Sequence, residues 1–172
     1  MKPDLDQLFR TERERLLALG LQLTGNPALA EDAVQEAFLL AHRFAGSFRG
    51  EAAAGTWLYR ITIRVATKLR QRERATKGRE RRSTGRPEPY RPDEACAMRD
   101  RVVALYRAME DLPEEQRTAL AMLSLRGLPA SRIAEILEVP EGTVYSRAHA
   151  ARRAIRRALP ADPVQVLASD HA

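Results

Sequence analysis

Apolar residues recur along most of the 172-residue chain at the three- and four-residue spacing of amphipathic helices. Runs of Val, Ile and Thr bounded by turn residues, which would indicate strands, are scarce. The pattern therefore predicts an all-α fold with two small helical domains joined by a flexible linker, the C-terminal domain being a helix-turn-helix.

Three helices are predicted in the first domain, over residues 1–72. Asp4 is a suitable N-cap for the first helix, which ends at the turn residues 24–27. The same turn begins a second helix, which ends at Gly46. After a glycine-containing loop, Thr56 is expected to cap a third helix that has a cationic outer face.

Helical periodicity disappears over about residues 73–92, where basic residues and prolines dominate, and the predicted linker spans residues 73–98. Such a segment cannot bury enough apolar surface to offset the entropy of ordering it, so we expect a flexible linker. The periodic pattern returns in a second domain over residues 99–160, and residues 161–172 are expected to form a frayed tail.

The second domain has the helix order and turn lengths of a helix-turn-helix. Asp111 is expected to cap a helix with Pro113 at its first position. A short helix follows over about residues 131–137. A tight turn at residues 138–142 then leads into the last helix, which begins near Thr143.

The charge of the chain narrows the class of partner. The net charge is +6 and the sequence pI is about 10.1, which favours a polyanionic partner. Basic residues gather between Arg60 and Arg86 and again between Thr143 and Pro160, whereas the N-terminal stretch is mixed to acidic. Two separate nucleic-acid contacts are therefore expected.

The last helix carries the residues expected to read DNA. In a helix-turn-helix, the N-terminal part of the second helix faces base edges, while cations further along bind phosphates. Ser146 and Arg147 suit the first role, and Arg152 and Arg153 suit the second. The residues predicted at or beside this surface are Thr143, Tyr145, Ser146, Arg147, His149, Ala150, Arg152 and Arg153.

Several classes of protein are disfavoured by the sequence. No apolar run approaches the roughly 18 residues of a membrane span, so we expect no membrane insertion and a cytoplasmic location. The single cysteine excludes an internal disulfide, and the histidines form no HExxH-type pair. Since no phosphate-cradling glycine motif is present either, we expect no enzyme activity, no metal and no cofactor.

Segments of both domains are similar to one known family. The stretch LPEEQRTALAMLSLRGLPASRIAEILEVPEGTVYSRAHAARRAI resembles region four of the extracytoplasmic-function (ECF) sigma factors, which belong to the sigma-70 family. In the first domain, LTGNPALAEDAVQEAFLLAHR is similar to the family's polymerase-binding helix. The segment FAGSFRGEAAAGTWLYRITIRVATKLRQR is similar to the loop and helix that open the minus-ten element.

This resemblance implies an RNA polymerase sigma factor, which directs core RNA polymerase to specific promoters and initiates transcription. It also implies promoter DNA and an anti-sigma factor as partners, the latter wedged against both domains. The alternative is a stand-alone helix-turn-helix transcriptional regulator, whose first domain senses a ligand or forms a dimer.

The resemblance assigns residues in the first domain as well. The acidic helix is expected to dock on core polymerase through Asp32, Gln35, Glu36, Phe38 and Leu39. The residues expected at the minus-ten DNA are Phe48, Arg49, Gly50, Trp57, Arg60, Arg64 and Lys68. A loop with aromatics, glycines and a cation before a basic helix is suited to holding an unstacked base while the backbone is gripped. The last helix would read the minus-thirty-five element.

Some positions depart from the family's usual pattern. Arg64 and Lys68 stand where the family commonly has Asn and Asp, so we expect phosphate contacts there in place of base contacts. Tyr145 and Ala150 stand where basic residues are common, and Glu138 occupies the place of the usual turn glycine. The sequence of the minus-thirty-five element is accordingly left open.

Overall fold

The computed structural model describes residues 3–48, 50, 52–84, 104–105 and 107–159. Its elements are α1 (Leu5–Thr24), α2 (Pro27–Phe44), the 3₁₀ turn η1 (Ala45–Ser47), α3 (Ala54–Thr84), α5 (Glu114–Leu123), α6 (Ala130–Leu137) and α7 (Glu141–Ala158). Residues 104–105 and 107–110 are also helical, and the described part of the chain contains no strand. The all-α prediction is confirmed.

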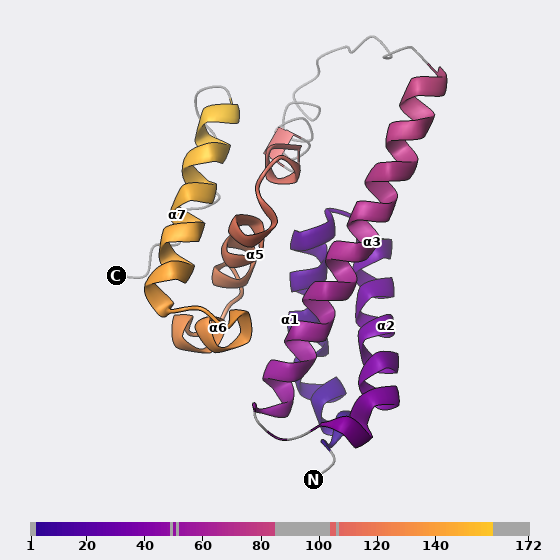
Figure 1. The fold of residues 1–172 in the computed structure, drawn as a ribbon, viewed down its shortest axis with the longest axis vertical. Coiled ribbons are helices and arrows are strands. Elements are labelled where there is room, and N and C mark those ends of the chain that lie inside the picture. The colour runs from indigo at the N-terminus through magenta and orange to yellow at the C-terminus, as the bar shows by residue number, and fades with distance from the viewer. Residues whose placement is uncertain (1–2, 49, 51, 85–103, 106, 160–172) are drawn as a thin grey trace.

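Helices α1, α2 and α3 form a bundle, in which they lie side by side (Figure 1). The Asp4 carboxylate accepts the backbone N–H of Gln7 at 2.9 Å, so the predicted first cap is confirmed. Gly25 ends α1 in the left-handed conformation, at φ 68°, which favours glycine. A Cβ on Gly20 would lie 3.2 Å from the Cα of Ala30, so this glycine permits the close approach of α1 and α2.

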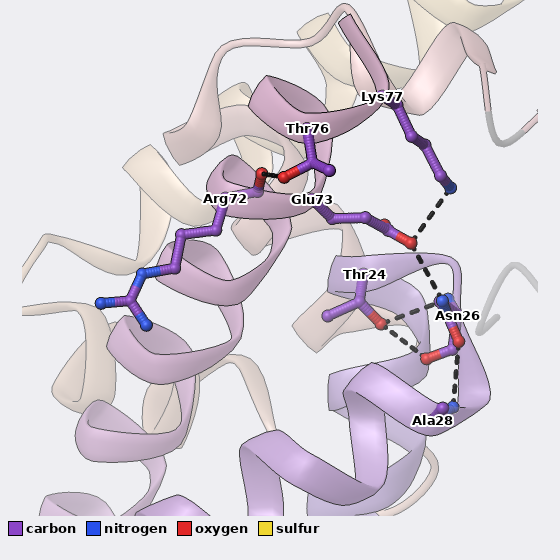
Figure 2. A network of polar contacts seen from close by, with 7 residues as sticks. All are labelled: Thr24, Asn26, Ala28, Arg72, Glu73, Thr76 and Lys77. Atoms are coloured by element: carbon purple, nitrogen blue, oxygen red, sulfur yellow. Dashed lines mark hydrogen bonds and ion pairs between the residues drawn. The ribbon is translucent and has the colours of Figure 1, made fainter. Parts of the chain in front are cut away.

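Helix α3 is longer than the sequence pattern predicts. The linker was expected to begin at residue 73, whereas residues 73–84 continue the helix. Figure 2 shows one reason, because the Glu73 carboxylate accepts hydrogen bonds from Asn26 Nδ2 and pairs with Lys77 Nζ, both at 3.0 Å. The rest of the predicted linker, residues 85–98, lies outside the described residues, as does the predicted tail.

Helix α5 begins without the predicted cap. Its N-cap position is Pro113, which offers no side-chain acceptor, and Asp111 lies outside the helix. A buried arginine, Arg117, organises the segment instead. It donates from Nε to the carbonyl of Met109 at 2.7 Å and from Nη2 to the carbonyls of Glu110 and Leu112. The segment before α5 is therefore held by its carbonyls and not by an N-terminal side-chain cap.

Helices α6 and α7 form the expected helix-turn-helix. Thr143 lies in the first turn of α7, and Val144, Ala148 and Ile155 on its inner face are buried, as predicted. In α6 the helical spacing places Leu137 inward, but the structure buries Ile136 more fully. The difference arises because α6 also packs against α3.

The two domains are packed against each other. Buried residues of α1 and α3, such as Leu16 and Leu58, belong to the same apolar cluster as Met122 of α5, Ile133 of α6 and Val144 of α7. A second cluster, which includes Leu112, Leu120, Ala151 and Ile155, stays within the C-terminal domain. In this structure α6 and α5 therefore lie against the bundle, with α6 beside α3 and α5 beside α1 (Figure 1).

Candidate nucleic-acid interface

The outer face of α7 carries the residues predicted to read DNA. Tyr145, Ser146, His149 and Arg153 are exposed, and Thr143, Arg147, Ala150 and Arg152 are partly buried. Tyr145 keeps 52% of its surface accessible, which is unusual for a large aromatic side chain. The start of α7 thus presents an aromatic ring, a hydroxyl and an imidazole to solvent, the kinds of groups that contact bases.

Arg147 is already paired within the domain. Its Nη2 atom lies 2.6 Å from Glu115 Oε2, a carboxylate on α5 that is 70% exposed. The Ser146 hydroxyl donates to the carbonyl of Thr143 at 3.1 Å. Glu115 is exposed, and the Thr143 carbonyl lies in the same helix turn as Ser146. Arg147 and Ser146 can therefore give up these contacts for a base edge at a modest cost in free energy. The ion pair holds the guanidinium of α7 against α5.

A row of cations lies along α3 at helical spacing. Arg64 and Lys68 are exposed, and among the described residues neither makes an ion pair. Arg72 continues the row one turn later and is also exposed, with a side chain that extends away from the Glu73 network in Figure 2. Arg72 was not among the predicted site residues, although the four-residue spacing from Lys68 is a signal that could have found it.

Arg60, the first predicted cation of α3, is not free. Its Nη1 atom lies 2.8 Å from Glu138 Oε1, beyond the end of α6. Its Nη2 donates to the carbonyl of Glu135 at 2.8 Å, and its Nε donates to the carbonyl of Ile136 at 3.0 Å. The structure therefore separates Arg60, which contacts the other domain, from Arg64 and Lys68, which face solvent.

Two aromatic residues meet at the start of α3. The rings of Phe48 and Trp57 lie 5.3 Å apart between centroids, with an angle of 49° between their planes. Both are partly buried, and Trp57 packs against the main apolar cluster. Gly50 adopts φ 73° between them in sequence, while Arg49 lies outside the described residues. The aromatic pair is suited to stacking on an unpaired base at the edge of the bundle.

The predicted acidic surface lies on α2. Asp32 and Gln35 are exposed, Glu36 is partly buried, and Leu39 is 70% exposed. Phe38 differs, because it is only 8% exposed and packs edge-on against Phe9 with ring centroids 5.0 Å apart. Phe38 therefore supports the surface from beneath, and Leu39 is the apolar residue that a partner would meet first.

Other kinds of site find no support in the described part of the chain. No group of His, Cys, Asp and Glu there is arranged to hold a metal ion. No helix among the same residues is long and apolar enough to cross a membrane.

Comparison with known proteins gives matches in both domains. Residues 8–76 match the profile of sigma-70 region 2, and residues 103–155 match that of sigma-70 region 4. The chain is 34% identical over 154 residues to the ECF RNA polymerase sigma factor SigM of Mycobacterium tuberculosis, covering 90% of this chain and 76% of that protein. It is 37% identical over 134 residues to the ECF RNA polymerase sigma-E factor of Escherichia coli, covering 72% and 70%.

Two solved structures share the fold. The sigma factor RpoE from Bartonella quintana, in complex with the anti-sigma factor NepR, has a TM-score of 0.58 at 23% identity and covers 92% of this chain and 98% of that one. CnrH, in complex with the cytosolic domain of CnrY, has a TM-score of 0.62 at 17% identity and covers 89% and 85%. At these identities the likeness concerns the fold alone.

Proposed function

The chain belongs to the ECF sigma factors of the sigma-70 family, and from this premise we propose which of its surfaces carry out each step of initiation. An ECF sigma factor directs core RNA polymerase to specific promoters. The match to region 2 over residues 8–76 disfavours a stand-alone helix-turn-helix regulator, whose first domain would sense a ligand or form a dimer. Residues 1–72 would bind polymerase and the minus-ten element, and residues 99–160 the minus-thirty-five element.

The minus-ten contact is carried by α3 and the loop before it. The single observation that supports this most strongly is the exposed row of Arg64, Lys68 and Arg72, whose side chains would bind phosphates. The Phe48 and Trp57 pair would stack on a base displaced from the duplex. Binding energy for the separated strand drives opening, so no hydrolytic step is required.

The minus-thirty-five contact is carried by α7. Tyr145, Ser146, Arg147 and His149 would reach base edges, and the arginines at 152 and 153 would bind phosphates. Arg147 would leave Glu115 for the DNA. Because each domain alone has a small contact surface, joining both contacts in one chain raises the overall affinity through effective concentration.

Core polymerase would dock on α2. Asp32, Gln35 and Glu36 offer acidic and amide groups beside the exposed Leu39, a combination that fits a basic, partly apolar partner surface. We further propose an anti-sigma factor as a partner, because one solved neighbour, RpoE of Bartonella quintana, is a sigma factor in complex with an anti-sigma factor. The site of action would be the cytoplasm, where the polymerase and chromosome are.

Transcription in vitro with purified core polymerase, followed by mapping of start sites, tests these assignments. Arg147→Ala is expected to lower promoter-specific transcription about tenfold, the effect of losing one good base contact, while core binding stays unchanged.

Asp32→Ala combined with Glu36→Ala should weaken core binding about tenfold or more, because charged pairs across an interface are lost.

Matched controls are available on the same helices or the same domain. Arg157→Ala removes an exposed cation near the end of α7, and Glu14→Ala removes an exposed acid from α1. Both are expected to leave transcription and core binding close to wild type. Loss of core binding in the Arg147 variant would contradict the division of labour, and tight promoter binding without any association with core would contradict the function itself.

A further inference from the structure

One face of α3 is covered by the C-terminal domain through polar contacts. We define the docked row as Thr56, Arg60, Gln71 and Arg74, which span about 27 Å of helix. The Thr56 hydroxyl donates to Glu135 Oε1 at 3.0 Å, and Gln71 Nε2 donates to Glu114 Oε2 at 3.3 Å.

Arg74 makes two further contacts of the docked row. Its Nη1 donates to the carbonyl of Glu110 at 2.8 Å, and its Nη2 lies 3.7 Å from Asp111 Oδ1. Arg60 adds the three contacts described above. In all of these contacts the donor lies on α3 and the acceptor lies in the C-terminal domain. The side chains among these acceptors form the acidic face, which consists of Asp111, Glu114, Glu135 and Glu138.

The chemistry of the acidic face resembles that of a nucleic-acid backbone. A DNA strand presents a row of anionic oxygens to cationic and hydroxyl donors. The acidic face presents carboxylate and carbonyl oxygens to the same types of donor along the same helix that is proposed to bind the minus-ten strand. At Arg60 the match is closest, because the guanidinium meets a carboxylate and two last-turn carbonyls of α6 together.

The backbone at Glu138 supports the importance of this contact. Glu138 adopts φ 56° and ψ 42°, a left-handed conformation that favours glycine and that costs energy for other residues. The chain instead places a glutamate there, and its carboxylate lies 2.8 Å from Arg60.

The same interface contains a feature that disfavours permanent closure. Arg70 of α3 is only 5% exposed, and its Nη1 atom has no hydrogen-bond partner among the described residues. Burial and the neighbouring Arg70 and Arg74 lower the pKa of Arg117 on α5 to about 10, with burial the larger cause. Burying the two cations Arg70 and Arg117 costs desolvation free energy, which opposes docking.

We propose that the acidic face is an intramolecular substitute for the DNA backbone. In the free chain it occupies Arg60 and Arg74, and promoter DNA must displace it to reach this side of α3. The inference rests on the proposed minus-ten role of α3. It adds that the C-terminal domain, besides reading its own element, competes with DNA for the first domain.

Binding of single-stranded DNA by the full-length chain without polymerase tests the competition. The probe is a fluorescent oligothymidylate at low salt, because stacking and phosphate contacts tolerate any base. Glu138→Gln removes one carboxylate of the acidic face and should tighten binding about two- to fivefold, the effect of losing one exposed ion pair. Glu141→Gln removes an exposed acid three residues away, outside the acidic face, and should leave binding unchanged.

Energy transfer between two dyes distinguishes undocking of the C-terminal domain from a general effect of net charge on DNA binding. Cys96→Ser leaves no native cysteine, so that dyes can be attached at Arg43→Cys on α2 and Arg157→Cys on α7, both exposed positions. Energy transfer between the dyes should fall in Glu138→Gln and in Arg60→Ala. The two changes combined should give no more than the larger single effect, because they break the same contact.

Distinct results would overturn the proposal. Equal tightening by Glu138→Gln and Glu141→Gln would show that only net charge matters, and unchanged binding and energy transfer in Glu138→Gln would show that no competition exists. If the wild-type chain supports promoter-specific transcription in the same preparation, either result rejects the competition alone. If it does not, the proposed function itself fails.

Discussion

Tyr59 joins α3 to α1 through a single buried group. The side chain is 2% exposed, and its hydroxyl donates to Glu12 Oε2 at 3.0 Å. Burial, together with the charge of Glu12 and its hydrogen bond, raises the pKa of the phenol well above its usual value. The folded chain thus holds the proton more tightly than the unfolded chain. This contribution to stability is complete below about pH 10 and is lost as the pH rises further.

Tyr59→Phe is expected to lower the free energy of unfolding at pH 7 by about 1 kcal/mol, the net value of one hydrogen bond. Above about pH 10 the wild-type chain should lose stability more steeply than the variant, because only the wild-type chain has this phenol to ionise on unfolding. Urea denaturation at pH 7 and at about pH 11 measures both effects. Parallel pH dependence in the two proteins would show that Tyr59 ionises normally.

Single residues also mark the limit of inference from the sequence. Asp4 works as the predicted cap because its partner, Gln7, is three residues away in the same helix. Arg117 gives no comparable signal, since an arginine within α5 looks like an exposed surface residue. Only the fold shows that it is 3% exposed and binds the carbonyls of the preceding segment.

At the scale of elements, α3 shows how contacts between helices extend a local pattern. Its apolar positions lose their period after residue 72, yet the helix continues to Thr84. Arg, Lys, Glu and Ala have high helix propensity. In addition, the Glu73 carboxylate accepts a hydrogen bond from Asn26 in the turn between α1 and α2 (Figure 2). Hydrophobic periodicity indicates which residues are buried, so it does not detect a helical extension whose residues follow no apolar period.

Glu73→Ala should fray this extension. The variant loses the hydrogen bond from Asn26 and the pair with Lys77, so amides over residues 73–77 should exchange with solvent several-fold faster, about the effect of 1 kcal/mol. Hydrogen exchange monitored by mass spectrometry measures the change. Glu73→Gln keeps an oxygen acceptor for Asn26 and is expected to be intermediate. Unchanged exchange in Glu73→Ala would assign the extension to helix propensity alone.

At the scale of the whole molecule, the order of the helices among the described residues was predictable, but their mutual packing was not. The spacing of Leu58 or Ile133 shows that each faces inward, without showing that both belong to one apolar cluster. The same holds for the cations of α3. The sequence presents Arg60, Arg64 and Lys68 as equivalent, and only the position of α6 distinguishes the first from the other two.

The apolar cluster shared by the two domains predicts that the domains unfold together. Met122→Ala, in α5, should lower the free energy of unfolding by about 2–4 kcal/mol, as expected for a truncated core methionine. Trp57 is the single tryptophan and lies in the first domain, so its fluorescence reports that domain separately from the helicity of the whole chain. Both probes should shift to the same lower urea midpoint. A fall in the helicity midpoint without a shift at Trp57 would mean that the domains unfold independently.

The turn at Glu138 has a consequence for timing. The backbone N–H of Val139 donates to the carbonyl of Ala134 at 3.1 Å, so the C-terminal domain fixes this turn by itself. The backbone that carries the Glu138 side chain is thus held in the same conformation whether or not α3 is docked. Docking of the C-terminal domain on α3 then requires only a movement of the two folded domains, which takes about microseconds to milliseconds. A chain released from a promoter is expected to close at that rate.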